Sequence, residues 1–70
     1  MAEGLANRLR DLRGERDLTQ AALAEAVGVS RKTINTVENG VFVPSTILAL
    51  KLARALGCGV EEIFSLEGSD

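Results

Sequence analysis

Two helix-forming segments of this chain are joined by a very short turn, and this connection limits the fold more than any other feature. Thr19 is a favourable N-cap for a helix over 20–27. Gly28 follows at the position of a left-handed C-cap residue. Ser30 then caps a further helix over 31–39. Two helices with so little chain between them have the geometry of a helix-turn-helix.

The helix-turn-helix unit, over about 20–39, also has the side chains that this geometry requires. Ala24 is small at the point where the two helices cross, and Gly28 adds no side chain to the turn. Ile34 and Val37 lie on one face of the second helix, where they can anchor it to a core. A larger residue at position 24 would separate the two helices.

Apolar spacing predicts helices on both sides of this unit. Leu5, Leu9 and Leu12 fall at i, i+4 and i+7, which indicates a first helix over 5–16. Pro44 and Ser45 open a fourth helix that runs to Leu56 and stops at Gly57, and a last helical turn covers Val60 to Phe64. Only the short stretch "FSLE" has strand character. We therefore predict an all-α, compact bundle of about five helices forming a single domain over 1–70, with a short C-terminal tail over 65–70.

Composition excludes several classes of protein. With 46% hydrophobic and 26% charged residues, the chain is typical of globular domains. It has no histidine and one cysteine, Cys58, so a zinc site, a histidine-based catalytic site and an internal disulfide are not expected. No apolar run is long enough to span a membrane. We predict a cytoplasmic protein that is not an enzyme, binds no metal or cofactor, and shows no sign of a small-molecule ligand.

Cys58 lies between two glycines and allows two interpretations. It is a small packing residue or, because the glycines make the loop pliable, a thiol switch.

The charge pattern points to an anionic partner. The formal net charge is −2, but the excess acid lies after residue 60, and residues 1–40 are neutral. Arg31 and Lys32 open the helix over 31–39, although a helix N-terminus carries about half a positive charge and favours anions. The negative charge of an anionic ligand would offset the positive charges gathered at this helix start.

The sequence resembles the Cro and lambda-repressor type of helix-turn-helix proteins, the xenobiotic-response-element family. The resemblance is carried by "NRLRDLR", "LTQAALAEAVGVSRKTINTVENG", "PSTILALKLARALG" and "VEEIF", and it covers about Leu5 to Phe64. It implies a bundle of about five helices that inserts the helix over 31–39 into the major groove of duplex DNA.

The resemblance also implies roles for individual residues. The predicted base contacts are Ser30, Arg31, Lys32, Thr33 and Thr36. Arg31 and Lys32 lead this set, because their side chains can donate to O6 and N7 of guanine. The alternative is that these two residues are simply a solvated pair at a helix start.

Three further residues are predicted to contact the DNA backbone, namely Thr19, Gln20 and Asn39. The alternative to a DNA contact is a purely structural role, because glutamine is common in the first turn of a helix, as at Gln20, and asparagine is common at a helix end, as at Asn39. Arg13 and Glu38 are expected to form an ion pair that ties the first helix to the end of the recognition helix.

The chain departs from the family after "ENG", where many relatives carry a cation that holds the DNA backbone. Here residues 41–43 are Val, Phe and Val, which carry no charge. This predicts a shallower salt dependence of DNA binding. Arg8 and Arg10 are both candidates to replace the missing cation, and the sequence does not choose between them.

The fourth helix is apolar nearly all round, which favours association. Leu48, Ala49, Leu52, Ala53 and Leu56 form its predicted core face. Ile47, Leu50 and Leu66 are then the predicted homodimer interface, because a helix that is apolar all round is usually buried all round. The alternative is that Ile47 and Leu50 are isolated exposed residues, as is common.

We predict a dimeric repressor of a prokaryotic cytoplasm that binds a palindromic DNA operator. Two alternatives stay open: an antitoxin-like module whose helices sequester another protein, and the N-terminal DNA-binding domain of a longer ligand-sensing regulator.

Overall fold

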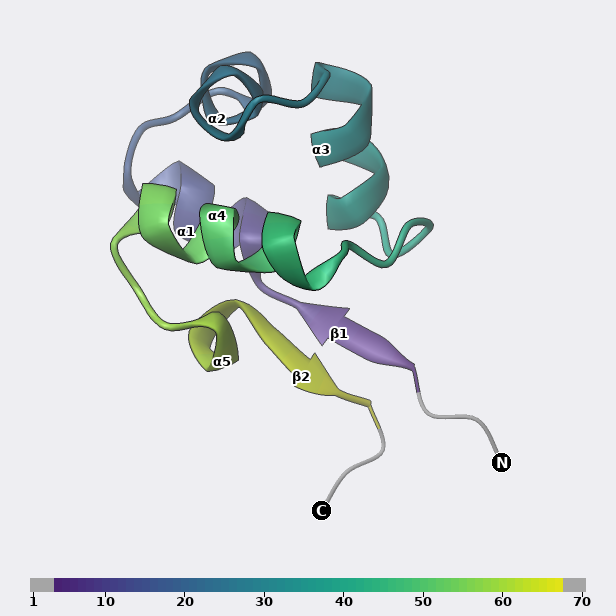
Figure 1. Cartoon of the computed structure of the whole chain (residues 1–70). Coiled ribbons are helices and arrows are strands. Elements are labelled where there is room, and N and C mark those ends of the chain that lie inside the picture. Colours follow the sequence, from purple (N-terminus) through teal and green to yellow (C-terminus); the bar gives the residue numbers. More distant parts are fainter. Residues whose placement is uncertain (1–3, 68–70) are drawn as a thin grey trace.

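A computed structural model describes residues 4–67 and contains five helices and one small antiparallel sheet. The elements, in chain order, are β1 (Leu5–Asn7), α1 (Leu9–Glu15), α2 (Gln20–Val27), α3 (Arg31–Glu38), α4 (Thr46–Leu56), α5 (Val60–Ile63) and β2 (Phe64–Leu66). Helices α2 and α3 lie on one side of α4, and the two strands lie beyond its other side (Figure 1). The predicted five-helix bundle is confirmed, with the sheet as an added element.

Capping residues set the ends of the three longer helices, as the sequence predicts. The hydroxyls of Thr19, Ser30 and Ser45 accept hydrogen bonds from the backbone N–H groups three residues further on, at 3.0, 3.2 and 3.1 Å. Gly28 and Gly57 end α2 and α4 with φ angles of 76° and 69°, in the left-handed region that a side chain disfavours. Helix α3 ends at Glu38, with Asn39 as its C-cap.

The predicted start of the first helix is wrong. Leu5 lies in β1, which pairs with β2 in the register Leu5↔Leu66 and Asn7↔Phe64, and α1 begins only at Leu9. The Asn7 side chain explains the change of direction, because its Oδ1 accepts from the Leu9 N–H at 3.1 Å while its Nδ2 donates to the Val37 carbonyl at 2.9 Å. The strand character of "FSLE" is confirmed, and Phe64 opens β2 instead of ending α5.

One apolar cluster holds these elements together. Its members are Leu9, Leu12, Leu23, Ala24, Val27, Ile34, Val37, Leu48, Leu52, Ala53, Leu56, Ile63 and Phe64. Ala24, Ile34 and Val37, which the sequence predicts to pack where α2 and α3 meet the core, are buried, whereas Ala49 of α4 and Cys58 are only partly buried against the cluster. The partial burial of Cys58 agrees with a packing role. The predicted tail over 65–70 is described only as far as Glu67, and its residues 68–70 lie outside the described range.

Candidate nucleic-acid interface

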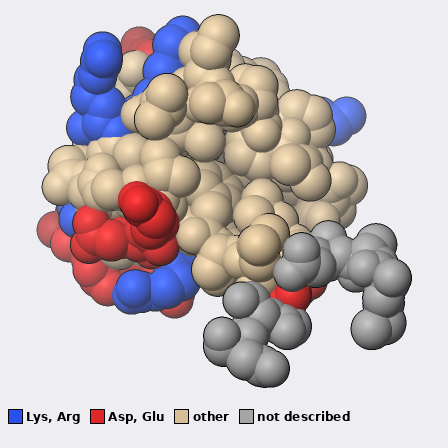
Figure 2. Space-filling model, turned by 60° about the horizontal axis from the view of Figure 1, so that its bottom comes forward, with Lys and Arg blue, Asp and Glu red and all other residues tan. Residues whose placement is uncertain are grey.

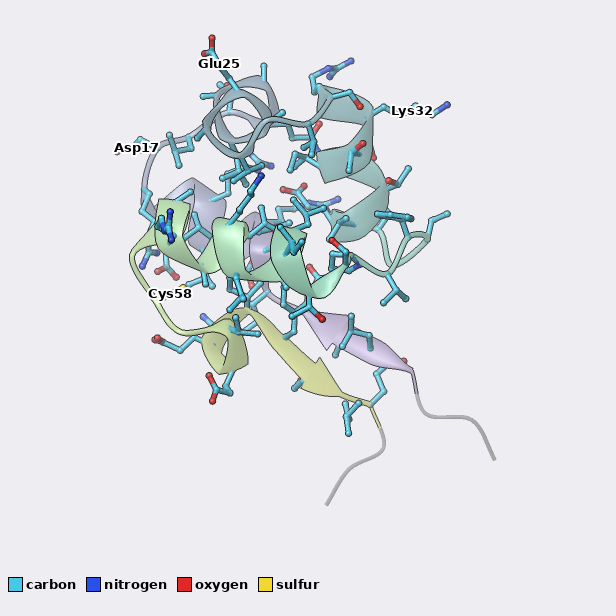
Figure 3. All side chains as sticks on the ribbon, in the orientation of Figure 1. Asp17, Glu25, Lys32 and Cys58 are labelled. Atoms are coloured by element: carbon cyan, nitrogen blue, oxygen red, sulfur yellow. The ribbon has the colours of Figure 1, made fainter. Side chains whose placement is uncertain are left out.

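The first turn of α3 presents two cations to the solvent. Arg31 and Lys32 are exposed, and neither forms an ion pair within residues 4–67. In Figure 3 the Lys32 side chain points away from the rest of the molecule. The first turn of α3 holds no acidic residue. The unfavourable charge at this helix start is therefore left uncompensated by the described chain.

The three hydroxyl residues predicted beside these cations are bonded within α3. Ser30 Oγ lies 3.0 Å from Thr33 Oγ1, and Thr36 Oγ1 donates to the Thr33 carbonyl at 2.9 Å. The Thr36 hydroxyl hydrogen is thus already used, while its oxygen can still accept a hydrogen bond.

Glu38 is the centre of a polar cluster that joins α1, α2 and α3. Its side chain is 0% exposed, and its carboxylate accepts hydrogen bonds from Arg13 Nε at 2.6 Å and from Arg13 Nη2 at 3.3 Å. Gln20 Nε2 also donates to Glu38 Oε1, at 2.9 Å. The ion pair predicted between Arg13 and Glu38 is present, and a third hydrogen bond of this arginine, from Nη1 to the Leu18 carbonyl at 2.9 Å, fixes its side chain further.

This cluster favours the ionised form of Glu38. Burial alone would raise the pKa of the Glu38 carboxyl, because it removes water from the charged form. Hydrogen bonds from Arg13 and Gln20, the positive charge of Arg13 and a contribution from Arg10 outweigh burial, so the pKa of Glu38 lies below its ordinary value. The carboxylate is therefore a fixed negative centre around which the arginines of α1 are arranged.

Thr19 and Gln20, the predicted backbone contacts of α2, also have structural partners. Thr19 is the N-cap of α2, and the Gln20 amide gives one of its two hydrogens to Glu38. The second amide hydrogen of Gln20 remains available to an acceptor outside the cluster.

Asn39 is bonded more fully than the sequence suggests. Its Nδ2 donates to both the backbone carbonyl and the side-chain Oδ1 of Asn35, and its Oδ1 accepts from Arg10 Nη2 at 3.1 Å. A phosphate contact by the Asn39 amide would require one of the bonds to Asn35 to break. The contact with Arg10 is not foreseen from the sequence, because the two residues are 29 positions apart.

The three apolar residues predicted to form a homodimer interface are all exposed, but they do not share one groove. Ile47, Leu50 and Leu66 are 68, 57 and 55% exposed. Leu50 and Leu66 line two adjoining grooves, both bordered by Val43 and Pro44. Ile47 lies instead in a third groove, near the turn between α2 and α3. Figure 2 shows a broad uncharged area on the face nearest the viewer.

The loop at positions 41–43 adds to this apolar surface. In the sequence, this loop is notable only because it lacks the cation that many relatives carry. The structure shows in addition that Val41, Phe42 and Val43 are all exposed. Their run of three apolar residues in a connecting segment is the signal that could have indicated a surface for association.

Comparison with known proteins identifies the family. The model of the helix-turn-helix family HTH_3 matches residues 9–63, from α1 to the end of α5. The chain belongs to this family. Its members are DNA-binding transcription regulators of the Cro and lambda-repressor type, and the predicted resemblance is confirmed.

Individual relatives match between 77 and 87% of the chain. An uncharacterized HTH-type transcriptional regulator of Bacillus subtilis, YgzD, is 41% identical over 61 residues, which is 87% of this chain and 92% of the relative. The restriction-modification controller protein C.AhdI of Aeromonas hydrophila is 40% identical, with a TM-score of 0.75 over 79% of this chain and 83% of its own. The P22 c2 repressor, solved in complex with a synthetic operator, is 35% identical with a TM-score of 0.75 over 77% and 82%.

Two observations concern other kinds of site. Within residues 4–67, none of the helices has the length and apolar character needed to cross a membrane. The same residues contain no group of three or more His, Cys, Asp or Glu side chains placed to hold a metal ion.

Proposed function

We propose that this chain, as a single domain over 1–70, binds palindromic duplex DNA as a homodimer and represses transcription at the chromosome of a prokaryotic cell. Membership of a family of DNA-binding regulators supports the general activity. The observation that carries the proposal is the exposed, unpaired Arg31 and Lys32 at the first turn of α3. Helix α3 enters the major groove with this turn foremost, where Arg31 and Lys32 read guanine.

Apart from Asn39, whose side chain is bonded to Asn35 and Arg10, the remaining predicted DNA contacts divide into base and backbone contacts. Ser30, Thr33 and Thr36 face base edges beside the cations. Thr36 either accepts a hydrogen bond from a water molecule or contacts a thymine methyl group. Thr19 and Gln20 hold the phosphate backbone at the start of α2, and these contacts fix the register without reading sequence. Occupation of the operator then excludes polymerase sterically.

The proposed dimer forms through the apolar surface of α4 and β2. Leu50 and Leu66 line adjoining grooves, and Ile47 of α4 adds exposed apolar surface in a third groove. A small domain buries little surface of its own, and association is one way to add burial. In a two-fold dimer, two copies of α3 would reach half-sites about one helical turn, or 34 Å, apart.

Selection from random duplexes of about 30 base pairs tests the proposal, because this length holds two half-sites one turn apart. We expect a palindrome to be enriched. The double variant Arg31→Ala and Lys32→Ala should lose preference for the selected bases, at about 1–3 kcal/mol for each bidentate pair. The control is Lys51→Ala with Arg54→Ala on α4, which removes the same charge and should keep the preference.

Each part of the proposal has its own contrary result. No enrichment by the parent chain would refute sequence-specific DNA binding and favour a protein partner of the antitoxin-like kind. Enrichment of a single half-site would refute the dimer alone. Leu50→Lys tests the dimer directly: sedimentation should show a monomer, whereas an unchanged dimer would place the interface elsewhere.

A further inference from the structure

We propose that Arg10 of α1 is a phosphate-binding residue at the C-terminal end of α3, held in place by Asn39 and Glu38. The inference rests on the proposed DNA binding and adds a contact that neither the motif nor the loop after α3 supplies. Its chemistry is recognition of a phosphodiester by a guanidinium group.

Arg10 reaches from α1 to the end of the recognition helix. Its Nη2 donates to Asn39 Oδ1 at 3.1 Å, and its Nε lies 3.5 Å from Glu38 Oε1. The Arg10 side chain is nevertheless 62% exposed, whereas that of Glu38 is 0% exposed. A guanidinium carries five donor hydrogens, so those on Nη1 remain available for an acceptor from outside. The protein therefore orients the Arg10 side chain but leaves some of its donor hydrogens free.

The charges in this cluster leave one positive charge over. Glu38 is already bonded to Arg13 through both carboxylate oxygens, and the second arginine beside it is Arg10. Two guanidinium groups and one carboxylate sum to a net charge of +1, and Arg8 and Asp11, which line the same hollow, add charges that cancel. The solvent-facing member, Arg10, is the one that can meet an anion.

Arg8, the other candidate to replace the missing cation, is placed differently. Its Nη2 lies 3.9 Å from Glu15 Oε2 of α1, and within residues 4–67 its side chain forms no hydrogen bond or ion pair with α3. The structure thus distinguishes between two arginines that the sequence leaves equivalent. Arg10 is directed to the recognition helix, and Arg8 is directed along α1.

The position of Arg10 suits the border of a major groove. Helix α3 has eight residues, so its ends are separated by about 12 Å at a rise of about 1.5 Å per residue. The major groove is about 12 Å wide. When the first turn of α3 faces the bases, the opposite end lies toward the sugar–phosphate strand. Arg10 is held at that end by Asn39.

Asn39 acts here as a positioning residue. Both of its amide hydrogens go to Asn35, which leaves its Oδ1 directed to Arg10. This arrangement restrains the long arginine side chain before any ligand arrives, and so reduces the rotamer entropy lost on binding.

Salt dependence of binding to a duplex of about 30 base pairs from the selected pool tests this proposal. For Arg10→Gln we expect the slope of log Kobs against log salt to become shallower by about 0.9 per protomer, with the ranking of single-base-pair variants of the operator unchanged. Arg10→Lys should restore the slope. Arg54→Gln, the same loss of charge on α4, should leave it unchanged.

Three results would overturn the inference. An Arg10→Gln slope equal to that of Arg54→Gln, with both variants still binding, would refute the phosphate contact while leaving the proposed function intact. Failure of the parent chain itself to bind the duplex would refute both. Arg10→Gln and Arg10→Lys could also lower the thermal midpoint equally and both give a shallower salt slope than the parent chain. That result would assign Arg10 a purely structural role.

Discussion

Replacing the buried carboxylate of Glu38 should destabilise the chain strongly, because Arg13 would be left without its partner, and Glu38→Gln tests this. The amide that replaces the carboxylate keeps one oxygen for Arg13 but turns donor hydrogens toward groups that are themselves donors, Gln20 and Arg13. Removing one partner of a buried ion pair costs about 3–5 kcal/mol. Arg13 is 17% exposed and keeps its bond to the Leu18 carbonyl, so we place the loss at the lower end, about 3 kcal/mol.

This loss is a substantial part of the total stability. A domain of 70 residues has about 4–10 kcal/mol in all at the usual 0.05–0.15 kcal/mol per residue. A loss of about 3 kcal/mol corresponds to a thermal midpoint lower by about 12–24 °C in a domain of this size. Circular dichroism during heating and urea unfolding at pH 7 would measure both quantities.

A matched substitution on α1 provides the control. Glu15 lies 3.9 Å from Arg8 and 3.6 Å from Arg16, but its side chain is 59% exposed, so Glu15→Gln should cost less than about 1 kcal/mol. If Glu38→Gln destabilised the chain no more than Glu15→Gln does, the view of Glu38 as the centre of a stabilising cluster would be refuted.

Acid should weaken the same cluster. The pKa of Glu38 is lower in the folded chain than in the unfolded chain, so its ionised form stabilises folding above its ordinary pKa of 4.5. This contribution is lost as the pH falls through the lowered pKa of the folded state. The parent chain should therefore lose more stability than Glu38→Gln between pH 7 and the acid range, as urea midpoints at each pH would show. Parallel curves would contradict this expectation.

The remaining predictions concern local backbone structure. Gly28→Ala should destabilise the chain by about 1 kcal/mol although no atom lies within 4 Å of the added Cβ, because φ is +76° there. Gly14→Ala, also without a neighbour within 4 Å but inside α1, should instead stabilise it by up to about 1 kcal/mol. Shifts of the same sign in urea midpoints would contradict the conformational argument. Ser45→Ala should cost about 1 kcal/mol by removing the cap on the Leu48 N–H, and an unchanged thermal midpoint would show that the cap contributes nothing.

Local signals predict the part of the fold that carries the proposed interface. Thr19 and Gly28 define the two ends of α2, and Ser30 defines the start of α3, through bonds and dihedral angles within a few residues, which is why these positions can be predicted from sequence. The start of α1 is misread for the opposite reason. Leu5 fits the helical spacing, but its partner in the sheet is Leu66, and pairing at that separation has no local signal.

The same distinction applies to the candidate interface. The exposed cations at the start of α3 follow from their place after Ser30. The choice of Arg10 over Arg8 depends on Asn39, which the chain brings into contact only when α1 packs beside α3. Sequence reasoning therefore identifies which residues are chemically suited to DNA, whereas the structure shows which of their hydrogen-bond donors are already used.

The pairing of β1 with β2 has a practical consequence for rearranging this chain. Strands that pair in a sheet lie about 5 Å apart, so the first and last described elements are neighbours. A short flexible linker could join them, and new termini could open in the exposed loop at 41–43. Such a circular permutant would retain the α2–α3 unit as one uninterrupted segment while placing any fused reporter next to the end of α3.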